Sequence, residues 1–202
     1  MPSSPDLVAC VVDLTAREGT VLERPQGHRA HALFLSLIEA TDPEPSAQLH
    51  ASAPIKPWTI TPLHQQGRRL RHGDAYPLRV SFLQASLYLP FARAFLDTPN
   101  RSVRLADGEF ALQAIHTTCD SSHWAGVQSW RELINRAAPA DELTLQFRSP
   151  TAFSLATDER GRKRYGLFPD GPTVFRSLIK RWNAFSPLPL DAAILDEVDI
   201  LT

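Results

Sequence analysis

The chain has 202 residues, of which 43% are apolar, and its 21 Lys and Arg residues against 22 Asp and Glu give a formal net charge of -1. This length allows one large domain or two small ones, and the composition excludes a disordered chain. The sequence has no apolar run of about 18 residues, which a membrane helix needs, and no signal-peptide pattern at its start. We therefore expect a cytoplasmic globular protein without a membrane partner.

The first part of the chain alternates strands with amphipathic helices. Leu33, Phe34, Leu37 and Ile38 recur at helical spacing, and short apolar or alternating runs indicate strands. In chain order we predict a strand at 7–14, a helix at 28–40, a strand at 58–61, a basic loop at 66–73, a strand at 78–83, a helix at 85–96 and a strand at 110–115. This βαββαβ order is typical of the ferredoxin-like fold, which RNA-recognition domains share, although a fold alone does not establish a function.

A second unit follows a connector that carries Trp124 and Trp130. We predict a strand at 143–147, a charged hairpin or loop at 158–164, a helix that Pro172 opens and a strand at 197–201. The chain is therefore predicted to be an α+β protein with tandem ferredoxin-like (RRM-like) domains: residues 1–120, a connector at 121–140, and an incomplete second domain at 141–202. Because the second unit reaches only βαβ, we expect a truncated chain or a fragment of a longer polypeptide.

Basic side chains gather in two windows, residues 45–96 and 148–181, whereas acidic residues gather elsewhere. Most of these basic residues are Arg, whose planar group can pair with a phosphate through two N–H groups. The segregation suits a polyanionic partner, although an ordinary mixed surface remains an alternative. The candidate phosphate-binding residues are Arg68, Arg69, Arg71, Arg148, Arg176, Lys180 and Arg181.

Three stretches stand out by their order and spacing. Leu49-His50 precedes Lys56-Pro57-Trp58-Thr59-Ile60-Thr61-Pro62-Leu63, residues 147–153 read Phe-Arg-Ser-Pro-Thr-Ala-Phe, and residues 168–172 read Phe-Pro-Asp-Gly-Pro. Together they resemble the motifs of the CRISPR-associated repeat-processing endoribonucleases, the sixth Cas family of the repeat-associated RNA-binding superfamily. The resemblance implies two ferredoxin-like halves and a glycine-rich segment near the C-terminus. The last glycine here is Gly171, which agrees with the expected truncation.

The resemblance also implies a reaction: metal-independent cleavage of CRISPR repeat RNA in precursor transcripts, which makes guide RNAs. The ribose 2′-OH attacks the adjacent phosphate and leaves a 2′,3′-cyclic phosphate and a 5′-OH. Such a step needs a base for the 2′-OH, an acid for the leaving oxygen and a cation for the charge that builds on the phosphate.

His50 matches the catalytic position of the family and is the main catalytic candidate, because histidine titrates near neutral pH. Lys56 lies six residues later between Pro54 and Pro57, and it is the candidate for holding the phosphate or stabilising its charge. His31, on the predicted helix, is the third candidate, because family members often bring a helical Tyr or His to the same centre.

Other functions remain open. Trp58 and Thr61 stand where the family usually has Phe and Ser, which leaves room for a non-cleaving subunit that binds repeat or guide RNA, or for a protein-assembly module. Other CRISPR effector or adaptation proteins are further candidate partners. No paired His, Cys or carboxylate spacing indicates a metal site, and we expect no cofactor. The four tryptophans are expected to pack in the core rather than to stack on bases.

Overall fold

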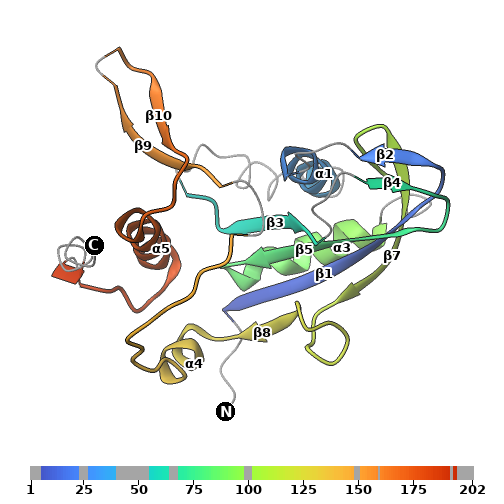
Figure 1. Cartoon of the computed structure of the whole chain (residues 1–202). Coiled ribbons are helices and arrows are strands. Elements are labelled where there is room, and N and C mark those ends of the chain that lie inside the picture. The colour runs from blue at the N-terminus through green and yellow to red at the C-terminus, as the bar shows by residue number, and fades with distance from the viewer. Residues whose placement is uncertain are drawn as a thin grey trace. The chain divides into compact units, whose positions relative to one another are not determined.

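The computed structural model describes residues 6–22, 27–39, 55–63, 68–97, 102–147, 151–158, 160–191 and 193–194. The chain divides into two compact units, Met1–Arg136 and Ala137–Thr202 (Figure 1). The first unit contains β1 (Leu7–Ala16), β2 (Thr20–Leu22), α1 (Gly27–Glu39), β3 (Trp58–Pro62), β4 (Arg68–Leu70), β5 (Ala75–Phe82), a 3₁₀ turn (Ala85–Leu87), α3 (Tyr88–Asp97), β6 (Ser102–Leu105), β7 (Gly108–His116), β8 (Gly126–Gln128) and α4 (Trp130–Asn135). The second contains β9 (Phe153–Thr157), β10 (Lys163–Gly166) and α5 (Gly171–Phe185).

The first unit is built on a six-stranded sheet whose strands lie in the order β3-β5-β1-β7-β6, with β8 also paired to β1. All of these pairs are antiparallel. With α1 between β1 and β3 and α3 between β5 and β7, the unit has the ferredoxin-like βαββαβ arrangement. The predicted α+β class is confirmed.

One face of this sheet carries the hydrophobic core, because strand residues alternate between the two faces. Along β1 the residues from Val8 to Ala16 at every second position are buried in the same cluster as Phe34 of α1 and Phe91 of α3. Phe34 and Phe91 stack with ring centroids 5.4 Å apart. Both helices therefore cover one face, and we call the opposite face the rear face.

The predicted strands and helices of the first unit are present, with their ends shifted by a few residues. The predicted basic loop at 66–73 is wrong in part, because residues 68–70 form β4, which pairs with β2. Strands β2, β6 and β8 and helix α4 were not predicted, since each is only three to six residues long and leaves little periodicity.

In the second unit, the predicted strand at 143–147 is wrong. Those residues have no regular secondary structure, and Leu143, Leu145 and Phe147 are all exposed. An alternation of apolar and polar residues does not by itself produce a strand, because a strand also needs a neighbouring strand that shares its backbone hydrogen bonds. The described residues of the charged segment at 158–164 form the turn after β9 and the first two residues of β10, and the predicted helix is α5. The predicted strand at 197–201 lies outside the described residues.

Candidate active site and nucleic-acid interface

His31 and Trp58 form an aromatic contact where α1 packs on β3. Their ring centroids are 4.6 Å apart, and Trp58 also packs on Phe34 at 4.2 Å. Trp58 is buried, whereas His31 is exposed. The indole therefore supports one side of the imidazole and leaves other parts of that ring open to solvent, which is the arrangement an acid or base needs to reach a substrate.

Lys56 lies two residues before Trp58 and is half-buried. The neighbouring Pro57 is tied to the end of β5, because its carbonyl oxygen accepts a hydrogen bond from the Leu83 N–H at 2.7 Å. The two residues from Lys56 to Trp58 span at most about 7 Å of chain, and His31 contacts Trp58. Lys56 and His31 therefore both lie near the start of β3, at one edge of the sheet. His50, the main catalytic candidate, lies outside the described residues.

The basic residues around β4 are held by a small two-stranded sheet. Arg68 pairs with Leu22 and Arg69 with Val21, and the side chain of Arg69 is exposed. Arg71 follows β4, and its N–H donates to an Asp74 carboxylate oxygen at 3.0 Å. The strand pairing places exposed cations on an ordered ribbon rather than on the loop that the sequence indicated.

Helix α5 carries three of the predicted cations of the second unit. Arg176 and Lys180 are exposed and four residues apart, which places them on one helix face, and Arg181 is half-buried. Asp170 begins this helix by accepting a hydrogen bond from the Thr173 N–H at 2.8 Å, and that bond lowers the pKa of the Asp170 carboxyl. Arg148 lies outside the described residues.

A second group of cations, not among the predicted binding residues, lies on the turn between β9 and β10 and at the start of β10. We call Arg160, Arg162, Lys163 and Arg164 the basic hairpin. Three of its members, together with Thr157 and Asp158, line a hollow of about 370 Å³. The run of basic residues around Gly161 was the sequence signal.

Asp158 shapes this turn. Its carboxylate accepts hydrogen bonds from the N–H groups of Arg160 and Arg162 at 2.9 and 2.8 Å, and from Arg162 Nε at 3.0 Å. The backbone hydrogen bond from Arg162 is the main cause that lowers the pKa of this carboxyl. Gly161, with φ 74°, supplies the left-handed backbone conformation that the turn requires. The one acid of the described turn is thus bonded within it, and the hairpin presents net positive charge.

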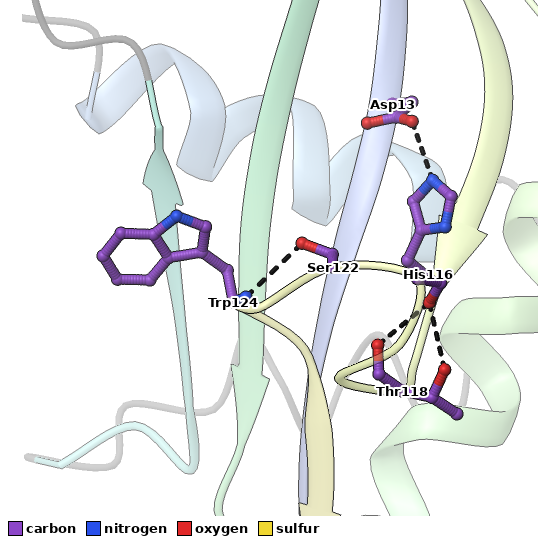
Figure 2. A network of polar contacts seen from close by, with 6 residues as sticks. Asp13, His116, Thr118, Ser122 and Trp124 are labelled. Atoms are coloured by element: carbon purple, nitrogen blue, oxygen red, sulfur yellow. Dashed lines mark hydrogen bonds and ion pairs between the residues drawn. The ribbon is translucent and has the colours of Figure 1, made fainter.

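The rear face of the first unit brings together a histidine and an aspartate. His116 Nε2 lies 2.8 Å from Asp13 Oδ2, and Figure 2 shows the two side chains pointing toward one another from β7 and β1. They are 103 residues apart in sequence, so no local pattern could reveal the pair. Within the part of the chain that the structure describes, no group of three or more His, Cys, Asp or Glu is placed to hold a metal ion. None of the described helices is long and apolar enough to span a membrane.

Comparison with known proteins gives a consistent result for both units. Residues 7–135 match the family model of the CRISPR Cas6 N-terminal domain, and residues 145–200 match that of the CRISPR-associated endoribonuclease Cas6. No curated protein sequence matches the chain.

Solved structures are similar over nearly the whole chain. A product complex of the Cas6 protein TTHB231 is 30% identical, with a TM-score of 0.80, over 98% of this chain and 73% of that chain. The structure named Thermus thermophilus Cas6 (TTHB231) is 27% identical with a TM-score of 0.69, over 98% and 71%. A product complex of Cas6 (TTHA0078) is 26% identical with a TM-score of 0.69, over 95% and 69%.

Proposed function

Because the chain belongs to the Cas6 family of CRISPR-associated endoribonucleases, we propose that it cleaves CRISPR repeat RNA in precursor transcripts and so produces guide RNAs. The observation that carries this proposal is the pair of family matches at 7–135 and 145–200, which together cover both units. Further support comes from the similar Cas6 proteins that were solved with a product and with a substrate mimic.

The proposed reaction uses the RNA's own nucleophile and no metal ion. A base takes the proton of the 2′-OH, its oxygen forms a bond to the adjacent phosphorus, and the bond from phosphorus to the 5′-oxygen breaks. An acid gives a proton to that leaving oxygen, so the products carry a 2′,3′-cyclic phosphate and a 5′-OH. Each such proton transfer contributes about 10²–10⁴-fold to the rate.

We assign the proton transfers to histidine and the charge stabilisation to lysine. His50 is the main proton-transfer residue, and His31 is the candidate for the second transfer because its imidazole is exposed beside Trp58. Lys56 donates to the phosphate oxygens as negative charge builds up, since an ammonium group placed near a developing charge lowers the barrier. The hydrogen bond at Pro57 supports a fixed position for the Lys56 backbone.

RNA contact is assigned to cations on both units. On the first unit these are Arg68, Arg69 and Arg71, and on the second they are Arg148, Arg176, Lys180 and Arg181, to which we add the basic hairpin. Each cation that contacts a phosphate releases counterions, so the affinity for RNA is expected to fall steeply with salt.

Cleavage of repeat RNA in EDTA tests the proposal directly. The expected products are a 5′-OH fragment, which a polynucleotide kinase labels without prior phosphatase, and a fragment that ends in a cyclic phosphate. A repeat RNA with one 2′-deoxy sugar at the cleavage site should bind but remain uncut, because the nucleophile is missing.

The histidine assignments need a matched comparison. His50→Ala should lower the cleavage rate by about 10²-fold or more, and His31→Ala should lower it as well. His28→Ala removes a neighbouring exposed imidazole from the first turn of α1 and should cleave at the parent rate. If His50→Ala and His28→Ala cleave equally fast, the assignment of His50 is wrong.

A further inference from the structure

The loop between β7 and β8, residues 117–125, leaves the sheet, and the residues on either side of the loop both pair with β1. On β1, Val11 pairs with His116 before the loop and Ala9 pairs with Gly126 after it. Within the loop, the Thr118 carbonyl accepts hydrogen bonds from the N–H groups of Ser121 and Ser122 at 3.2 and 3.0 Å. The loop is therefore an ordered projection over the rear face.

Trp124 is held at its backbone from both sides. Its N–H donates to Ser122 Oγ at 3.4 Å, and its carbonyl oxygen accepts from Arg79 Nε of β5 at 2.9 Å. Figure 2 shows the indole on the side of the loop that points away from Asp13 and His116. The ring is half-buried, and its centroid lies 4.9 Å from that of His123. These two bonds hold the backbone of Trp124 in place.

Beneath the loop lies a cleft of about 720 Å³, within the size range of small-ligand sites. Trp124 and His123 line it from the loop, Arg79 and Ser81 from β5, and Arg136 from the end of α4. The Ser81 Oγ is buried and makes no hydrogen bond to any group that the structure describes.

The charge of this cleft favours an anion. Burial lowers the pKa of the Arg79 guanidinium below its ordinary value, yet such a group stays cationic at neutral pH. Only one of its N–H groups is used by Trp124, which leaves others for a ligand. Glu132 is the acid among the lining residues, and one of its carboxylate oxygens accepts from the Ser129 N–H at 2.8 Å. An aromatic ring and two arginines in one cleft match the base and the phosphate of a nucleotide.

We propose that this cleft binds one unpaired nucleotide of the RNA, with its base against Trp124 and its phosphate between Arg79 and Arg136. The inference rests on the proposed function only in taking RNA as the ligand. It adds a binding subsite on the rear face, apart from the edge of the sheet where His31 and Lys56 lie. Base–aromatic stacking contributes about 1–3 kcal/mol per base, which is roughly fivefold to a hundredfold in affinity.

Cys119 provides a direct reporter of occupancy, because it lines the cleft and is exposed, whereas Cys10 is buried. The experiment measures the rate of iodoacetamide modification of each cysteine by mass spectrometry. The protein is saturated either with the uncut 2′-deoxy repeat RNA or with a fully paired RNA duplex of equal length. We expect the repeat RNA to slow modification of Cys119 several-fold, the duplex to leave it unchanged, and Cys10 to stay unreactive throughout.

Two variant pairs test the contacts. Trp124→Ala should weaken repeat binding by at least fivefold, as the stacking energy requires, whereas Trp124→Phe should keep most of the affinity. Arg136→Ala should reduce the slope of log affinity against log salt by about 0.7, whereas Arg131→Ala, on the same helix but outside the cleft, should leave it unchanged. Circular dichroism checks that each variant is folded.

The outcomes separate this proposal from the cleavage proposal. If repeat RNA saturates the protein while Cys119 remains as reactive as in the unbound protein, the cleft is not an RNA subsite. Equal affinities for the parent and Trp124→Ala, in a variant whose fold is intact, would also overturn it. A chain that binds RNA and protects Cys119 but does not cleave supports the subsite and refutes the proposed catalysis. A chain that binds no RNA refutes both.

Discussion

The basic hairpin allows a quantitative test of RNA binding. Arg160, Arg162 and Arg164 line the same hollow, but of their three side chains only that of Arg162 is shown donating to Asp158, with its Nε 3.0 Å from the carboxylate oxygen. Each cation that contacts a phosphate of single-stranded nucleic acid contributes about 0.7 to the slope of log affinity against log salt. Replacing all three arginines by alanine should therefore lower the slope by about 1.4 to 2.1, where the upper value requires a full contribution from Arg162.

The ion pair with Asp158 predicts unequal contributions within this set. Arg160→Ala and Arg164→Ala should each lower the slope by about 0.7, whereas Arg162→Ala should lower it less, because Asp158 already neutralises part of that charge. The assay is fluorescence anisotropy of the uncut 2′-deoxy repeat RNA at several salt concentrations. Arg104→Ala, an exposed arginine on β6, is the control for net charge and should keep the parent slope. Parallel lines for the parent and the triple variant would refute the assignment of the hairpin to RNA binding.

Two further predictions concern the stability of the first unit. Gly108→Ala should lower the free energy of unfolding, measured in urea, by about 1–3 kcal/mol, because the added Cβ would lie 2.8 Å from two atoms of the Thr20 side chain. Adding Thr20→Ala to this variant should recover part of the loss. If the double variant recovers nothing, this clash is not the cause. Burial raises the pKa of the Cys10 thiol from 9.0 to about 12, so the folded chain keeps a proton that the unfolded chain loses above pH 9. Stability from this group is complete below pH 9 and declines between pH 9 and pH 12, and urea midpoints measured across that range should fall less in Cys10→Ala than in the parent.

The sequence predicted best the elements with long, regular patterns. The apolar run at 7–14 and the helical spacing around Phe34 each bury one complete face, so their positions follow from burial alone. The pattern at Leu143, Leu145 and Phe147 is equally regular, yet no described strand pairs with it. Strand formation depends on a partner elsewhere in the chain, which local alternation does not encode.

In the candidate site, too, the sequence predicted some residues, whereas contacts between distant segments became visible only in the structure. The resemblance singled out Lys56 and His31, and the structure adds the Trp58 indole that supports the imidazole of His31. The contact between Asp13 and His116 depends on the register of β1 against β7, and the hydrogen bond from Arg79 to Trp124 crosses 45 residues of sequence. Spacing along the chain carries no information on such pairs, so only the folded sheet reveals them.

The anchoring of the 117–125 loop on β1 has a consequence for how this domain could diversify. Both ends of the loop pair with neighbouring positions of β1, which its pairing with β5 also holds in place. Replacing the residues between these ends therefore changes the entropy of loop closure but not the register of the sheet. That entropy grows slowly with length, by about 0.6 kcal/mol per doubling. Grafting loops from distant homologues onto this position is therefore a route to altered ligand preference on an unchanged scaffold.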